Sequence, residues 1–137
     1  RYWRDRADRV YAFRSLLDAG VALAFGSDAP VAPLDPWCAI AAAVFRADAA
    51  DEPWHSEQAI TPAEALASST DGQGTVQIGQ PADLVLVDAD PLALGSLADR
   101  SATADGSPPA QADRAHLREL PVALTLVGGR RTHEALT

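Results

Sequence analysis

The first quarter of the chain combines a helical pattern with a short, continuously apolar run. Apolar residues recur at helical spacing across residues 5–19, and Gly20 stands where a C-terminal cap is expected. Residues 21–25 (Val-Ala-Leu-Ala-Phe) then show no polar alternation. Such a run is typical of a strand covered on both faces in a parallel sheet. The pattern therefore predicts a helix followed by a buried strand, which ends at the turn opened by Gly26.

Two further helices carry clear start signals. Asp35 is a suitable N-cap and Pro36 suits the first helical position. An apolar stripe follows at i, i+3, i+4, i+7 and i+8, formed by Trp37, Ile40, Ala41, Val44 and Phe45. The third helix is expected to open at Thr61, with a proline in the first turn and Glu64 at the capping-box position.

After residue 72 the pattern changes from helices to strands and turns. Residues 82–88 and 122–127 are rich in β-forming apolar residues, and Gly128-Gly129 predicts a hairpin turn into residues 130–133. Residues 92–119 are rich in Ala, Asp, Ser and Pro, which predicts a long, flexible and partly disordered surface insertion. The chain thus divides into a helix–strand–helix part, residues 1–71, and a small β unit, residues 72–137.

Composition excludes several classes of function. The 137 residues carry a formal net charge of −8, which argues against nucleic acid and anionic membranes as partners. No apolar run is long enough to span a bilayer, and the first residues lack the apolar centre of a signal peptide. One cysteine, Cys38, excludes an internal disulfide and favours a cytoplasmic location. The first residue is not Met, so we expect a cut end within a longer protein.

Asp28 is the main candidate for chemistry. It follows the predicted buried strand by three residues, and in a β/α barrel the C-terminal ends of the strands hold the active site. A carboxylate at that place could bind a cation and exchange a proton with a metal-bound water. The alternative is an aspartate that stabilises the turn by accepting hydrogen bonds from backbone amides. The residues alone leave both interpretations open.

A set of segments, in the same order as in a known family, resembles the C-terminal part of the amidohydrolase superfamily. The closest branch is amidohydrolase family 3, which includes N-substituted formamide deformylase-like proteins. The segments are Gly20-Val21-Ala22-Leu23-Ala24-Phe25-Gly26-Ser27-Asp28-Ala29-Pro30-Val31, Asp35-Pro36-Trp37, Ala43-Val44-Phe45-Arg46, residues 60–66, residues 79–88 and residues 125–130. They cover nearly the whole chain apart from the polar insertion, and together they are a strong signal although each one alone is weak.

The resemblance implies an α/β fold in two parts. Residues 1–71 would hold the last strand and helices of a metal-dependent hydrolase β/α (TIM) barrel, and residues 72–137 the C-terminal part of a small β-sandwich. Asp28 matches the family's metal-binding and catalytic aspartate. Ala29, Pro30, Val31 and Trp54 would lie near the substrate at the barrel mouth, and Arg46 matches a position of unclear role.

The resemblance also implies what this chain lacks. The family's His-x-His motif, its acidic ligand and its two later histidine ligands belong to earlier strands, and none is found here. His55, His116 and His133 fall outside the ligand positions and are interpreted as surface or turn residues. We therefore expect a divalent metal, zinc in the first place, in the complete protein and none in this chain alone, because catalytic zinc usually has three protein ligands.

The remaining candidates are interpreted structurally, and one alternative function stays open. Cys38 is assigned to packing, and Asp83 and Asp88 to turns at the ends of a strand. The main prediction is a hydrolase of non-peptide C–N bonds that acts on a small amide-like molecule and is inactive as this chain alone. The alternative is a non-catalytic module that associates through its incomplete β unit. Its partner would be a second copy or the missing N-terminal part.

Overall fold

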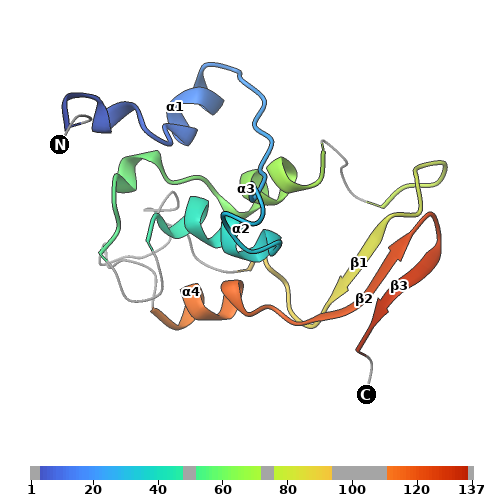
Figure 1. Ribbon diagram of the computed structural model, residues 1–137. Coiled ribbons are helices and arrows are strands. Elements are labelled where there is room, and N and C mark those ends of the chain that lie inside the picture. Colours follow the sequence, from blue (N-terminus) through green and yellow to red (C-terminus); the bar gives the residue numbers. More distant parts are fainter. Residues whose placement is uncertain (1–3, 48–51, 72–75, 94–110, 136–137) are drawn as a thin grey trace.

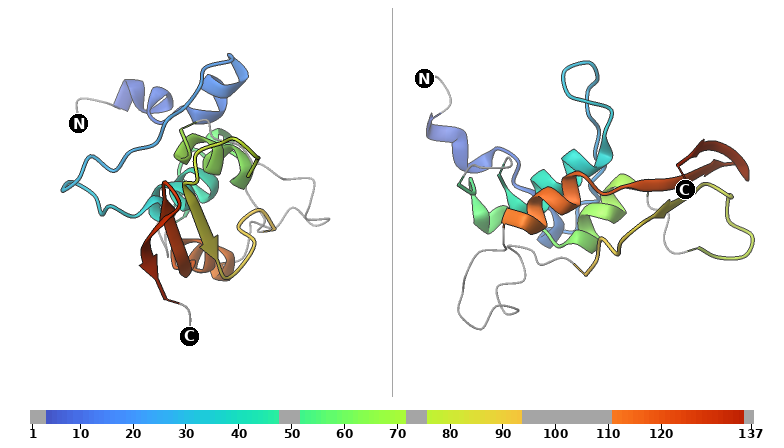
Figure 2. Two further views of the ribbon diagram at one scale, coloured as in Figure 1. Left: turned by 90° about the vertical axis from the view of Figure 1, so that its right-hand side faces the viewer. Right: turned by 90° about the horizontal axis from the view of Figure 1, so that it is seen from below.

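The computed structural model describes residues 4–47, 52–71, 76–93 and 111–135. Within these ranges it shows four short α-helices and, beside them, a three-stranded sheet. The helices are α1 (Phe13–Asp18), α2 (Pro36–Phe45), α3 (Pro62–Ser69) and α4 (Gln111–Arg118). Two 3₁₀ helices, η1 (Arg4–Arg9) and η2 (Ser56–Gln58), accompany them. The sheet extends to one side of the helical group, with the turn between β2 and β3 at its far end (Figures 1 and 2).

Helix α2 is the centre of the core, because α3 and α4 both pack against it. It begins as its sequence predicts: the Asp35 side chain accepts a hydrogen bond from the Trp37 amide at 3.0 Å, and Pro36 is the first helical residue. Four of the five predicted stripe residues are buried, and Trp37 packs against them partly buried. The core is formed by Ile40, Ala41, Ala43, Val44, Phe45, Ile60, Ala65 and Leu117.

Helix α3 carries the predicted capping box in full. The Thr61 hydroxyl accepts a hydrogen bond from the Glu64 amide at 3.2 Å, and the Glu64 carboxylate accepts one from the Thr61 amide at 2.8 Å. The same carboxylate pairs with the Arg14 guanidinium at 2.8 Å, so one side chain caps α3 and ties it to α1. Arg14 also bonds to Asp18 within α1.

We expect Glu64→Gln to remove an acid-sensitive part of the stability. Burial favours a raised pKa for Glu64, but hydrogen bonds from the Thr61 amide, Arg14 and the Thr61 hydroxyl outweigh it and lower this pKa. A lowered folded-state pKa adds stability that is present above the unfolded value of about 4.3 and is lost as pH falls through the folded value. Urea unfolding measures the difference in the free energy of unfolding between wild type and Glu64→Gln. This difference should be largest near neutral pH and become smaller in acid. An equal difference at pH 7 and pH 3, or the same pH dependence in the exposed control Glu119→Gln, would contradict the prediction.

The sheet has the order β1-β2-β3 and is antiparallel throughout. Strand β1 (Leu84–Val87) pairs with β2 (Val122–Val127), and β2 pairs with β3 (Arg130–Glu134). The predicted hairpin is confirmed, with both turn glycines at positive φ, 55° for Gly128 and 75° for Gly129. Asp83 has the predicted turn role, since its carboxylate accepts the Gly128 amide at 2.6 Å.

The predicted helix over residues 5–19 is interrupted. Tyr11 has a left-handed backbone, φ 53°, which separates η1 from α1. Its ring packs against Phe13 and Trp54, with centroids 5.9 and 6.5 Å away, and these contacts accompany the interruption. The end of the helix agrees with its sequence, because Gly20 (φ 77°) and the following amide bond back to carbonyls of α1.

Residues 21–25 do not form the predicted covered strand. They are extended, but none pairs in the sheet, and Val21 is 44% exposed. A strand is defined by hydrogen bonds to a neighbouring strand, and the described part of this chain places none beside this segment. What holds the segment is a bond from the Phe25 amide to the Ser68 carbonyl in α3, 2.8 Å.

The end of the predicted surface insertion is also different from the prediction. Residues 111–118 form α4, whose Leu117 is fully buried against α2, and Leu120 just beyond the helix is 4% exposed. The flexible-surface prediction is therefore wrong for this stretch, because a helix with an apolar face joins the core. Residues 94–110 lie outside the described residues. Helix α4 packs on α2 of the first part, while the division at residues 71 and 72 stays a prediction.

None of the helices in the described ranges is long and apolar enough to cross a membrane.

Candidate functional site

Asp28 stands at the turn that ends the extended segment. Its backbone is left-handed, φ 51°, and its carbonyl accepts the Val31 amide at 2.9 Å, which closes the turn. Its side chain is exposed and makes no hydrogen bond or ion pair to any residue that the structure describes. The turn is therefore held by the backbone of Asp28, and the carboxylate is left available for chemistry.

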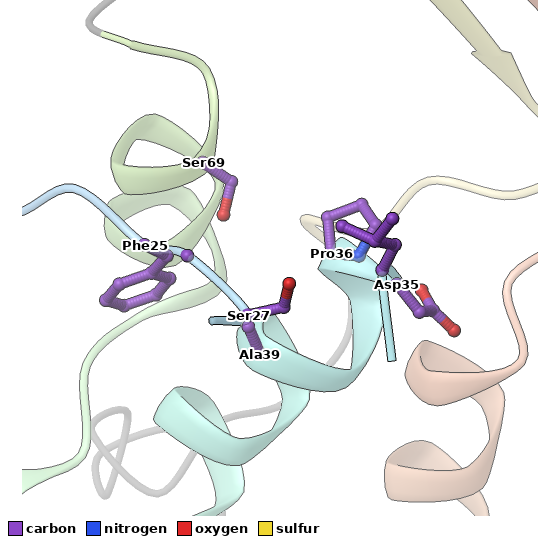
Figure 3. A pocket seen from close by; sticks show the side chains of 8 residues that line it. Phe25, Ser27, Asp35, Pro36, Ala39 and Ser69 are labelled. Atoms are coloured by element: carbon purple, nitrogen blue, oxygen red, sulfur yellow. The ribbon is translucent and has the colours of Figure 1, made fainter. Parts of the chain in front are cut away.

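A hollow of about 190 Å³ lies directly before this turn. Figure 3 shows Phe25 and Ser27 from the extended segment, Ser69 from α3, and Asp35, Pro36 and Ala39 around it. Asp28 follows Ser27 but does not line the hollow. Asp28 thus stands one residue beyond the lining of a small, mainly apolar depression at the N-terminal end of α2.

The Asp35 carboxylate closes the N-terminal end of α2 next to the hollow. One oxygen accepts the Trp37 amide, and the other lies 3.5 Å from the Cys38 sulfur. Cys38 is thus hydrogen-bonded to the Asp35 carboxylate and is not a member of the core cluster, so its assignment to packing stays a prediction. The Asp35 carboxylate also places negative charge on the positive end of the helix dipole, so an anion is not the ligand this end favours.

The predicted substrate-contacting residues are not brought together. Ala29, Pro30 and Val31 are exposed, Val31 by 82%, on a loop that projects from the helical group (Figure 2). Trp54 lies at the other end of α2, where its backbone exchanges hydrogen bonds with Arg46. A ten-residue helix is about 15 Å long. Trp54 and the Asp28 loop therefore do not border one site within this chain.

The described residues do not form a metal site. No group of three or more His, Cys, Asp or Glu side chains comes together among them. The histidines have other surroundings: His55 contacts Glu57 at 2.7 Å, His133 contacts the Val122 carbonyl at 3.1 Å, and His116 is exposed on α4. Catalytic zinc needs about three protein ligands and an open position, so the described residues, Asp28 included, do not supply its ligand set.

The burial and aromatic surroundings of Arg46 were not predicted from the sequence. It is 7% exposed and is the left-handed C-cap of α2, with φ 53°. Its guanidinium lies over the rings of Phe13 and Trp54, at 5.3 and 5.6 Å from their centroids. An arginine directly after an apolar stripe indicates the end of the helix, but the Phe13 ring comes from a distant part of the chain and the Trp54 ring from beyond the end of α2.

The comparisons with known proteins place the chain in a family. The model of the amidohydrolase family matches residues 1–133, and the chain belongs to that family. The family is generally metal-dependent, but the described residues bring no group of three or more metal-ligating side chains together.

Two curated relatives make the match more specific. "Putative amidohydrolase YtcJ" of Bacillus subtilis (strain 168) is 27% identical over 147 residues, which cover 98% of this chain and 24% of that protein. "N-substituted formamide deformylase" of Arthrobacter pascens is 31% identical over 94 residues, covering 61% of this chain and 17% of that protein. The chain thus spans a quarter or less of the length of these relatives. No solved structure matches it.

Proposed function

We propose that this chain supplies the catalytic carboxylate of a hydrolase that cleaves non-peptide C–N bonds in small amides or formamides. The observation that carries the proposal is the exposed, unbonded Asp28 carboxylate at the end of a segment that matches the amidohydrolase family. The substrate class is supported by the name of one relative, N-substituted formamide deformylase.

In the proposed reaction Asp28 acts as a general base and then as a general acid. A carboxylate oxygen takes a proton from the water that attacks the amide carbon, and it returns this proton to the nitrogen as the C–N bond breaks. The products are a carboxylic acid and an amine. General acid–base catalysis by one positioned side chain contributes about 10²–10⁴-fold to a rate. Asp28 opens the turn that its own carbonyl closes, and this leaves its carboxylate available for both transfers.

We further propose that the site is completed by residues outside this chain. Residues 1–71 would supply the last strand and helices of a β/α barrel, and residues 72–137 one share of a β-sandwich. Two observations support this: residues 21–25 are extended without a strand partner among the described residues, and the chain spans a quarter or less of its relatives. The metal ligands of the complete protein, and the residues that contact substrate beside Ala29, Pro30 and Val31, would come from that remaining part.

Asp28→Asn in the complete protein tests the proposal. We expect kcat for an N-substituted formamide to fall about 10²–10⁴-fold with little change in KM, because asparagine fits the left-handed backbone but cannot carry the proton. Asp71→Asn is a matched control, since Asp71 is also exposed and left-handed, with φ 52°. The proposal fails if both variants retain wild-type kcat, or if both lose it equally.

A non-catalytic module that associates through its β unit is the second candidate. Exposed apolar side chains on the sheet favour it: Val85 is 58%, Leu86 52% and Val127 54% exposed. Contiguous apolar surface at a strand edge promotes pairing with another chain. Light scattering on the purified chain tests whether it associates with a second copy, because a monomer at high micromolar concentration would refute this association.

A further inference from the structure

The buried guanidinium of Arg46 lacks a complete set of hydrogen bonds. Its Nε donates to the Trp54 carbonyl at 3.3 Å. Its Nη2 is buried and has no hydrogen-bond partner among the residues that the structure describes. Buried charged donors are normally bonded, because an unmade bond retains the full penalty of removing the group from water. The guanidinium is therefore prepared for an acceptor that the described part of the chain does not provide.

The Glu57 carboxylate, which attracts the Arg46 guanidinium, is engaged elsewhere. Burial lowers the pKa of Arg46, and the attraction of Glu57 opposes this shift. The Glu57 carboxylate, however, is bonded to His55 Nδ1 at 2.7 Å, and it makes no ion pair with Arg46 within the described residues. Glu57 thus favours the positive charge of Arg46 from a distance and leaves the buried nitrogen unpaired.

Aromatic side chains surround this cation and reach the surface. The guanidinium lies over the rings of Phe13 and Trp54, and the Tyr11 ring meets Trp54 edge-on at 6.5 Å. Tyr11 is 63% and Trp54 44% exposed. Tyr11, Arg46 and His55 all have φ between 51° and 53°, although none is a glycine. Left-handed backbones at bulky residues are costly and gather where a site must be held in one geometry.

We propose that Arg46, Trp54 and Tyr11 form a docking site for a polypeptide segment that carries a glutamate or aspartate between apolar residues. Arginine binds a carboxylate with two parallel hydrogen bonds, and arginine, tryptophan and tyrosine are the residues that dominate protein interfaces. The Trp54 amide donates to the Arg46 carbonyl, and the Arg46 Nε donates to the Trp54 carbonyl. The Trp54 indole is partly exposed, and entry of the carboxylate requires this ring to turn aside. The exposed Tyr11 and Trp54 rings would then cover the apolar residues that flank it.

A pair of peptides tests this site on the purified ¹⁵N-labelled chain. Acetyl-Leu-Glu-Leu-amide is the ligand probe, and acetyl-Leu-Gln-Leu-amide differs by the charge alone. In NMR titrations the glutamate peptide should shift the Arg46 Nε–H and Trp54 indole N–H signals, and it should bind about tenfold more tightly than the glutamine peptide. Arg46→Lys keeps the charge but loses the two-point geometry, so it should remove most of this preference.

Control variants separate the site from general charge attraction. Arg130→Met removes an exposed arginine on β3 and should leave both titrations unchanged. Arg46→Met should abolish the preference for glutamate, and its amide spectrum shows whether it is folded; if it is not, Arg46→Lys decides. Equal binding of both peptides by wild type, or an unchanged preference in Arg46→Lys, would overturn the proposal. Shifts of the same size with sodium acetate at equal concentration would also overturn it, in favour of a small-anion site.

Discussion

Phe45→Ala is expected to lower the free energy of unfolding by about 3–5 kcal/mol, the largest loss among single core substitutions in this chain. Phe45 is the last residue of α2 and is fully buried. It belongs to the cluster in which α2 meets α3 and α4. Removing its ring deletes apolar surface from the core and leaves a cavity that rigid neighbours fill only in part.

Urea unfolding followed by circular dichroism measures this loss. Leu34→Ala is the control, because Leu34 is 85% exposed and its truncation should change the free energy by no more than about 0.5 kcal/mol. A small domain has a total stability of about 5–15 kcal/mol, so Phe45→Ala should shift the midpoint strongly. Equal midpoints for the two variants would mean that α2 is not the centre of the core.

Leu117→Ala is expected to cost about 2–5 kcal/mol. Leu117 is fully buried and belongs to the core cluster, although the composition of its surroundings predicts a flexible surface insertion. If α4 packs on α2 as the structure shows, truncation of this side chain opens a cavity between the two helices. If residues 111–118 were instead a mobile surface segment, the same change would have almost no effect.

His116→Ala on the same helix is the matched control for Leu117→Ala. His116 is exposed, so its loss should change the free energy of unfolding by about 0.5 kcal/mol or less. The two variants differ in which face of α4 they alter. A difference of about 2 kcal/mol or more between them would establish the buried face of α4, and identical unfolding curves would contradict it.

Local signals predicted the parts of the fold that local chemistry determines. Asp35 with Pro36, Thr61 with Glu64, and the Gly128-Gly129 turn each satisfy backbone groups within a few residues, and all appear as predicted. The pattern over residues 111–120 also contained a signal, because Leu117 and Leu120 lie three residues apart among polar neighbours. The polar composition of the whole stretch outweighed that signal.

The failures concern contacts between distant residues. A strand over residues 21–25 requires a neighbouring strand, which no pattern within the segment can provide. The break at Tyr11 accompanies packing against Trp54, which is 43 positions away. The burial of Arg46 likewise depends in part on Phe13, 33 positions away. Asp28 was singled out by its place after an apolar run and by the family resemblance, whereas the hollow before it is built from three separate segments.

Elemental analysis of the purified chain after dialysis tests whether the chain holds a metal by itself. We propose that Asp28 is a catalytic residue whose partner metal ligands lie outside this chain. We therefore expect far less than one zinc ion per chain, because the described residues bring no three ligating side chains together. One or more zinc ions held per chain, and lost in Asp28→Asn, would contradict it and show that the chain builds a metal site by itself.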